Sequence, residues 1–260
     1  MATITQHAPG TFCWPELATS DAGGAKAFYA AVFGWTFNDT PMGEAGVYTT
    51  LRQGERSAGA LYPQGKDQAG VPPHWGAYVA VANADEAAAK AEGLGARQLM
   101  APFDVMDLGR MAVLQDPQGA IFSVWEARKH IGATVLDEPG ALCWTELMTP
   151  DVSGARSFYT GLFGWAPEDM AMGPMTYTVF KLGDKSKAGM MSLTPEMGPM
   201  PPHWLSYFAV KDSDATVAKA IMAGATVIVP PTDIPAVGRF AVLQDPQGAV
   251  FGILGATPPA

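Results

Sequence analysis

Hydrophobic and polar residues alternate along short stretches of the chain, and stretches with helical spacing separate them. Asp21 is a plausible N-cap for the first helix, and Gly34 is placed to end it. Strands rich in β-branched and aromatic residues follow, with turn residues between them. The elements predicted over the first half are strands 12–17, 47–51, 57–61, 76–81, 96–100, 110–114 and 120–125, and helices 22–33 and 84–93.

The same pattern occurs twice in the chain. Residues 9–17 match residues 139–147 at an offset of 130 (144 − 14), with Pro, Gly, Cys, Trp, Glu and Leu in common. The offset later becomes 129 (203 − 74), where Pro-Pro-His-Trp recurs. Matching of this extent indicates a duplication. We predict a first module over 9–127, a linker over 128–138 and a second module over 139–257.

Each module contains two βαβββ units in tandem. The predicted fold class is therefore α+β, with tandem modules that form curved mixed sheets, or half-open barrels. The interior of such a barrel is a natural cleft for a small ligand.

Composition and charge narrow the class of partner. The net charge of −9 and the pI of about 4.8 disfavour nucleic acid and anionic membranes. No apolar run reaches the roughly 20 residues that span a bilayer, and Met1 to His7 do not resemble a signal peptide, so we expect a cytoplasmic monomer or homodimer that binds a small molecule. Cys13 and Cys143 occupy matching positions, which favours small buried side chains over a disulfide.

Two motifs appear once in each module. The first runs from Asp21 through Phe28-Tyr29 to Phe33-Gly34-Trp35, and the second is the turn Asp116-Pro117-Gln118-Gly119 before an apolar strand. Together they resemble the vicinal oxygen chelate superfamily, which includes glyoxalase I, bleomycin-resistance proteins and extradiol dioxygenases. The tandem arrangement is most similar to that of two-module glyoxalase-like proteins of actinobacteria.

The resemblance also implies where a metal would bind. Metal-dependent members carry His, Gln or Glu on the first, fourth and last strands of a module. The corresponding places here hold Trp14, Gly76 and Ser123 in the first module, and Trp144, Leu205 and Gly252 in the second. These residues are poor ligands for a divalent metal, so we predict no metal and no other cofactor.

Glu16 and Glu146 are the candidate catalytic residues. Each lies two residues beyond Trp14 or Trp144, so strand alternation directs all four side chains toward the cleft. Desolvation would raise the pKa of such a carboxylate and suit it to proton transfer beside a carbonyl. In the alternative interpretation, each glutamate is structural, hydrogen-bonded to backbone amides or paired with Arg110 or Arg239.

Other side chains are candidates for substrate contact. His74 and His203 precede the fourth strand and could transfer a proton, bind metal with a glutamate, or only cap the strand. Asp104 and Asp233 lie six residues before Arg110 and Arg239, which predicts an ion pair that braces a loop. Trp125 matches Leu254, so the two clefts cannot be identical. The predicted substrate-binding set is Trp14, Trp144, Tyr48, Tyr177, Tyr78, Tyr207, His74, His203, Ser123, Trp125, Arg110 and Arg239, with core packing as the alternative for each aromatic residue.

Three functions remain open from the sequence. The first is a glyoxalase-like enzyme that acts on a small carbonyl or polyketide-type metabolite by carboxylate acid/base chemistry without a metal. The second is a protein that binds a drug or metabolite and leaves it unchanged. The third is a hydroxylase or dioxygenase with a metal held by glutamate and His74 or His203.

Overall fold

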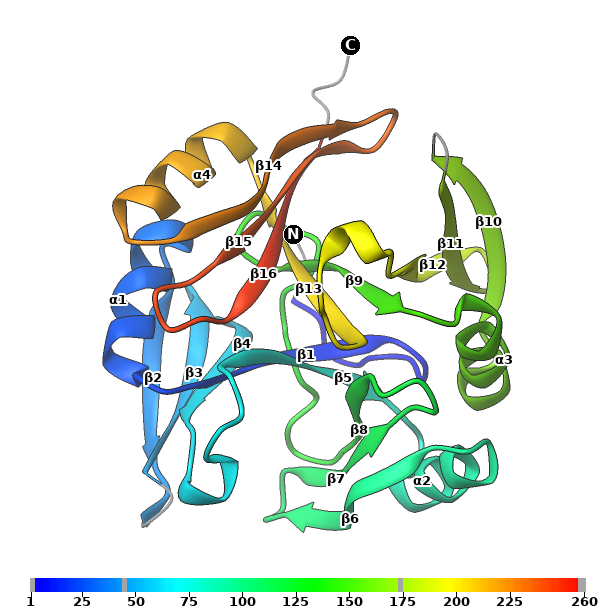
Figure 1. The fold of residues 1–260 in the computed structure, drawn as a ribbon. Coiled ribbons are helices and arrows are strands. Elements are labelled where there is room, and N and C mark those ends of the chain that lie inside the picture. The colour runs from blue at the N-terminus through cyan, green and yellow to red at the C-terminus, as the bar shows by residue number, and fades with distance from the viewer. Residues whose placement is uncertain (1–2, 44–45, 173–174, 257–260) are drawn as a thin grey trace.

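The computed structural model describes residues 3–43, 46–172 and 175–256. These residues form four α-helices and sixteen strands in two tandem modules, which confirms the predicted α+β, glyoxalase-like fold (Figure 1). The predicted end of the second module at residue 257, and the first two residues of the N-terminal segment, lie outside the described residues.

The first module is one mixed eight-stranded sheet with strand order β2-β3-β4-β1-β5-β8-β7-β6. The pairs β1–β4 and β5–β8 are parallel, and β1 pairs antiparallel with β5 at the centre, where the two βαβββ units join. Its elements are β1 (Phe12–Thr19), α1 (Ala22–Phe33), β2 (Thr36–Pro41), β3 (Val47–Gln53), β4 (Arg56–Pro63), β5 (His74–Ala80), α2 (Ala84–Gly93), β6 (Arg97–Val105), β7 (Gly109–Gln115) and β8 (Ile121–Ala127).

The second module repeats this topology in the order β10-β11-β12-β9-β13-β16-β15-β14. Its elements are β9 (Leu142–Thr149), α3 (Val152–Phe163), β10 (Ala166–Met172), β11 (Met175–Leu182), β12 (Lys185–Ser192), β13 (His203–Val210), α4 (Ser213–Met222), β14 (Thr226–Ile234), β15 (Gly238–Gln244) and β16 (Val250–Ala256).

The caps of the first helix formed as predicted, but the strand after it was missed. The Asp21 side chain accepts a hydrogen bond from the amide of Gly24 at 3.0 Å, and Gly34 ends α1 in the left-handed conformation with a φ of 72°. The strands β2 and β10 carry mostly exposed side chains at the edges of their sheets. They therefore lack the hydrophobic alternation that identifies a strand in a sequence.

The two family motifs meet each other across the boundary between the modules. Tyr159 of α3 donates a hydrogen bond to Asp116 Oδ2 of the first module at 2.8 Å, and Tyr29 of α1 donates one to Asp245 Oδ2 of the second at 3.0 Å. One hydrophobic core, which includes Trp35 and Trp165, extends through both modules. The helices face this shared core, and we call the opposite face of each sheet its inner face.

Among the residues that the structure describes, no helix is both long enough and apolar enough to cross a membrane.

Candidate functional site

On the inner face of the first sheet, Glu16 lies between two tyrosines. Tyr48 of β3 donates to Glu16 Oε1 and Tyr78 of β5 donates to Glu16 Oε2, each at 2.6 Å. Trp14 Nε1 donates to the Tyr48 hydroxyl at 3.1 Å. The structure thus brings together four of the residues that the sequence predicted for the first cleft, Trp14, Glu16, Tyr48 and Tyr78.

The second module builds the same cluster. Tyr177 of β11 donates to Glu146 Oε2 at 2.7 Å, and Tyr207 of β13 donates to Glu146 Oε1 at 3.1 Å. Trp144 Nε1 donates to the Tyr177 hydroxyl at 2.8 Å. We call these two groups of four residues the tyrosine–glutamate clusters.

Strand register explains why the tyrosines can reach the glutamate. On β1, Trp14 is paired with Tyr78, whereas Glu16 is paired with Gly76 on one side and Ala60 on the other. These two small neighbours leave room above the sheet for the tyrosine hydroxyls. In the second module Glu146 is paired with Gly189 and Leu205, and a Cβ at Gly189 would overlap the Tyr177 hydroxyl.

The environment of each carboxylate favours its protonated form. Burial raises the pKa of Glu16 and of Glu146 above the ordinary glutamate value, and the hydrogen bonds from the tyrosines offset part of that rise. Burial and the neighbouring carboxylate also raise the pKa of Tyr78 and Tyr207, so these hydroxyls remain protonated donors. In each cluster, therefore, two protonated tyrosine hydroxyls donate to one glutamate carboxyl group whose pKa is raised.

The two histidines lie at the beginning of β5 and β13. His74 Nδ1 is 2.9 Å from the carbonyl oxygen of Pro72, and His203 Nδ1 is 2.9 Å from that of Pro201. Burial lowers the pKa of His203. Each imidazole thus has a local backbone partner beside its cluster.

The residues at the superfamily's metal positions do not fit a metal ion. Of the three places in the first module, Gly76 has no side chain, and the indole nitrogen of Trp14 donates to Tyr48. Both oxygens of the neighbouring Glu16 already accept a hydrogen bond from a tyrosine. Across residues 3–43, 46–172 and 175–256, no three His, Cys, Asp or Glu side chains are grouped to hold a metal.

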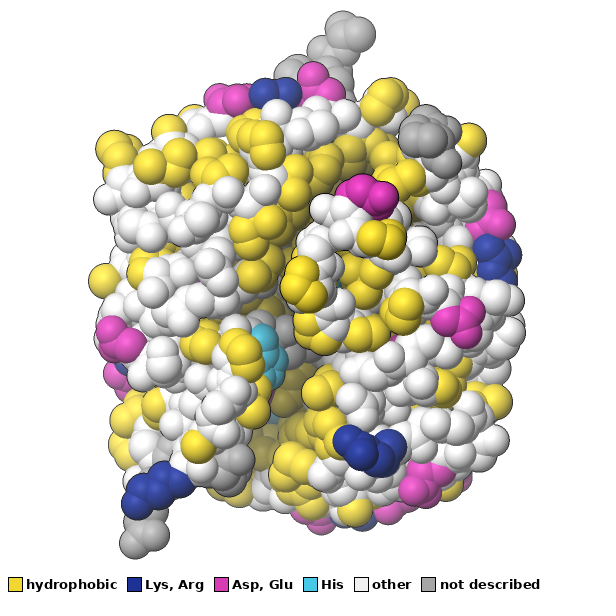
Figure 2. Space-filling view, viewed as in Figure 1, with side chains coloured by type: hydrophobic (Ala, Val, Ile, Leu, Met, Phe, Trp, Pro, Cys, Tyr) yellow, Lys and Arg dark blue, Asp and Glu magenta, His cyan; other side chains and the backbone are white. Residues whose placement is uncertain are grey.

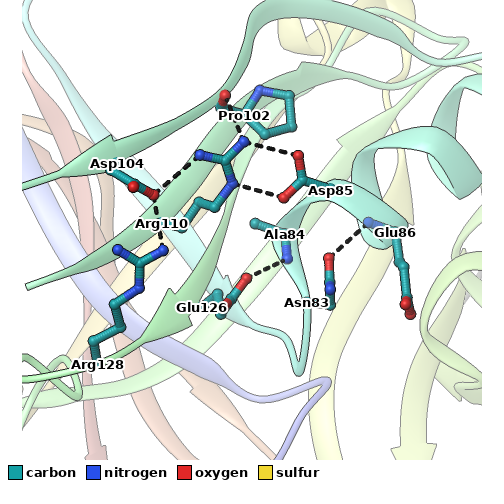
Figure 3. Close-up of polar contacts among 9 residues, drawn as sticks. All are labelled: Asn83, Ala84, Asp85, Glu86, Pro102, Asp104, Arg110, Glu126 and Arg128. Atoms are coloured by element: carbon teal, nitrogen blue, oxygen red, sulfur yellow. Dashed lines mark hydrogen bonds and ion pairs between the residues drawn. The ribbon is translucent and has the colours of Figure 1, made fainter.

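Arg110 and Arg239 bond aspartates, so the alternative interpretation in which they pair with Glu16 or Glu146 was wrong. Arg110 extends to the helix side of the sheet, where it bonds both carboxylate oxygens of Asp85 on α2, at 2.6 and 2.8 Å (Figure 3). It also bonds Asp104 at 3.0 Å, and Arg239 bonds Asp233 at 2.9 Å, which confirms the predicted loop-bracing ion pairs. On β7 the neighbouring residue Met111 lies on the inner face instead, where it is paired with Trp125 of β8 and packs in the same cluster as Trp14.

Ser123 and Trp125 of β8 complete the inner face of the first module. Ser123 is buried and paired with Tyr78, and Trp125 packs in the same hydrophobic cluster as Trp14. Trp125 Nε1 donates to the carbonyl oxygen of His130, a linker residue, at 2.8 Å. The matching residues in the second module are Gly252 and Leu254, so the inner faces of the two modules differ at these positions.

The sequence interpretation missed the linker as part of this site. The His130 ring meets the Trp14 ring edge-on, with centroids 4.6 Å apart and an angle of 88° between the planes. The amide of Ala133 donates to the carbonyl oxygen of Cys13 at 2.7 Å, so the linker lies directly on β1. No local pattern signals this contact, because it joins residues more than a hundred positions apart in the chain.

The outer shape of the molecule is consistent with ligand access. Figure 2 shows a groove down the middle of one face, with mainly hydrophobic walls and a histidine at its margin. Two hollows of about 350 and 430 Å³ lie elsewhere, and none of their lining residues belongs to a tyrosine–glutamate cluster.

Fold and site together define a tandem-module, glyoxalase-like protein with a tyrosine–glutamate cluster on the inner face of each module. The chain belongs to the glyoxalase/bleomycin resistance protein/dioxygenase superfamily, whose family model matches residues 11–124 and 141–253. It is 43% identical over 262 residues to "Putative glyoxylase CFP32" of Mycobacterium tuberculosis, covering 99% of both chains. It is 38% identical over 263 residues to "Anthracycline biosynthesis protein DnrV" of Streptomyces peucetius, covering 96% of this chain and 95% of the relative.

Solved structures share the fold at low sequence identity. The 2,3-dioxygenase LapB from Pseudomonas sp. KL28 matches with a TM-score of 0.65 and 15% identity, covering 100% of this chain and 95% of the other. The Mn(II)-bound glyoxalase from Novosphingobium aromaticivorans matches with a TM-score of 0.66 and 14% identity, covering 95% and 82%. These matches concern the fold alone.

Proposed function

We propose that this protein acts on a small carbonyl-bearing or polyketide-type metabolite, with the carboxylate of Glu16 or Glu146 as acid/base. The observation that carries the proposal is the tyrosine–glutamate cluster, in which burial raises the pKa of a carboxyl group held between two protonated hydroxyls. A carboxyl group with a raised pKa holds a proton more readily than an ordinary glutamate, which suits it to take a proton and return it. The names of the relatives, a glyoxylase and an anthracycline biosynthesis protein, support the same substrate classes.

The chemistry can be written without a metal or another reactant. The carboxylate removes the proton from the carbon next to a carbonyl, and the electrons of that C–H bond form the enolate. Once protonated, the glutamate is a weaker acceptor, so Tyr48 or Tyr177 is released to donate to the enolate oxygen. With an α-hydroxyketone, the enolate is an enediolate, and the glutamic acid returns its proton to the former carbonyl carbon. The hydroxyl proton of the second carbon moves to the enolate oxygen as the new carbonyl forms, so the product is an isomeric α-hydroxycarbonyl compound.

The test combines glutamate variants with a panel of α-oxoaldehydes, α-hydroxyketones and neutral aromatic polyketides. In D2O, turnover would place deuterium at the carbon beside the carbonyl. We expect Glu16→Gln with Glu146→Gln to lower exchange by at least about 100-fold, the usual contribution of a general acid/base. Glu55→Gln, a substitution at a fully exposed site, is the matched control. Full exchange in the double variant would refute the proposal.

A second candidate function is binding without conversion. This function is favoured because both oxygens of each glutamate already accept a tyrosine hydrogen bond. Such an arrangement would also hold the side chains rigidly as one wall of a binding site. A compound from the panel that binds tightly and is recovered without deuterium would favour this function, and exchange would exclude it.

A further inference from the structure

The duplication allows the inner faces of the two modules to be compared position by position. Four matched positions form the floor of each inner face, beside the tyrosine–glutamate cluster. In the first module all four side chains are buried, and in the second all four are partly exposed. The pairs are Cys13 and Cys143, Trp14 and Trp144, Met111 and Phe240, and Trp125 and Leu254.

The linker causes the burial in the first module. The His130 ring lies against both tryptophans, 4.6 Å from Trp14 and 5.9 Å from Trp125 between ring centroids. Gly132 has a φ of 102°, and a Cβ there would press on the Cys13 carbonyl, so the peptide lies flat on the strand. The first floor is therefore already covered by a ring and a peptide of the chain itself.

The second floor has two features that enlarge it. Gly189 and Gly252 stand where the first module has Ala60 and Ser123, and a Cβ at either glycine would overlap a cluster tyrosine. The tyrosines of the second module therefore lie closer to the sheet.

We propose that the second module is the one that binds the ligand, and that the ligand carries a flat, uncharged aromatic ring. The ring would rest on Trp144 in the place that the His130 ring occupies on Trp14. An aromatic floor without a lysine or arginine suits a neutral ring. Burial of the two carboxylates differs in the opposite direction, since Glu146 is more buried than Glu16. The ligand therefore reaches Glu146 through Tyr177, a partly exposed residue whose hydroxyl donates to that carboxylate. The inference rests on the proposed function in that this ligand is the substrate.

A matched pair of tryptophan variants tests the proposal. The probe is a neutral dihydroxyanthraquinone, and its Kd is measured by quenching of tryptophan fluorescence. We expect Trp144→Leu to weaken binding by about tenfold, the size of a lost aromatic contact, and Trp14→Leu to leave the Kd within about twofold of the unaltered protein. Equal effects, or a larger effect of Trp14→Leu, would overturn the proposal.

The two cysteines provide a measurement without any substitution, which decides the matter if Trp14→Leu does not fold. Cys13 is fully buried, whereas Cys143 is partly exposed, and burial raises the pKa of the Cys143 thiol to about 12. Labelling with N-ethylmaleimide over hours at mildly alkaline pH should therefore modify Cys143 alone. Saturating anthraquinone should slow that labelling several-fold, and an unchanged rate would contradict binding at the second floor.

Single glutamate variants separate this inference from the proposed function. If Glu146→Gln alone abolishes deuterium exchange, both are supported. If neither variant alters exchange while the probe still protects Cys143, the catalytic proposal fails and the binding site stands. If Glu16→Gln alone abolishes exchange, the assignment of the working module is overturned.

Discussion

Replacing Tyr159 with phenylalanine should destabilise the whole protein, because its hydroxyl connects the modules. The hydroxyl donates to the buried Asp116 carboxylate at 2.8 Å and accepts from Trp204 Nε1 at 3.0 Å. A hydrogen bond to a charged group contributes about 1.5–3 kcal/mol, and a buried N–H left unpaired costs about 1–3 kcal/mol. We therefore expect Tyr159→Phe to lower the free energy of unfolding by about 3–5 kcal/mol.

The pH dependence of this loss is a sharper test. Burial raises the pKa of Asp116 in the folded protein, so the stability linked to this group falls as pH rises from the unfolded pKa toward the folded one. The Tyr159 hydroxyl favours the charged carboxylate, and its removal raises the folded pKa further. The variant should therefore lose more stability at pH 8 than at pH 5.

Urea unfolding at both pH values, followed by tryptophan fluorescence, measures the effect. Tyr29→Phe is the matched variant, since Tyr29 makes the same two contacts, with Asp245 and Trp75. A loss below about 1 kcal/mol at pH 8 would be that of an ordinary hydrogen bond. That result, or a larger loss at pH 5, would refute the reasoning.

Three further predictions concern the clusters and the surface. Burial raises the pKa of Glu146, so its linked stability falls as pH rises above the ordinary value of 4.5, and Glu146→Gln should remove that part of the pH profile of unfolding. Equal slopes of unfolding free energy against pH in Glu146→Gln and in the unaltered protein would contradict this prediction. Gly189→Ala would force the new methyl group against Tyr177 and should cost about 1–3 kcal/mol in urea unfolding. The reverse change in the first module, Ala60→Gly, should cost only about 0.5–1 kcal/mol, so equal losses would be inconsistent with a tighter second cluster. Arg110→Gln removes exposed ion pairs, so its small effect on unfolding should shrink further at high salt, and an effect independent of salt would count against this reading.

The sequence predicted most of the fold because the fold depends on local patterns. Asp21 and Gly34 delimit a helix through their own side chain and backbone, and no distant residue is needed to identify them. The edge strands β2 and β10 were missed for the opposite reason. They form by pairing with β3 and β11, and their exposed side chains carry no hydrophobic alternation.

The candidate site was also predicted only in part. Its local features were found from the sequence, and its contacts between distant residues were not. Strand parity alone places Trp14 and Glu16 on one face, and this holds in the structure. The bonds from Tyr48 and Tyr78 depend on the register between strands, which a single sequence does not reveal. The contact of His130 with Trp14 depends on the path of a linker without regular structure, and it was missed altogether.

The strongest motifs in the sequence turn out to serve packing between the modules. Both Asp-Pro-Gln-Gly turns use one carboxylate oxygen to hold their own amides and the other to accept a tyrosine from the opposite module. Because both copies of the turn make the same contacts, the same residues are needed in both. A binding site in one module is under no such demand, so its residues are free to differ from their duplicates. The positions where the modules diverge, Trp125 against Leu254 and Ser123 against Gly252, therefore indicate which of the two otherwise identical clusters binds the ligand.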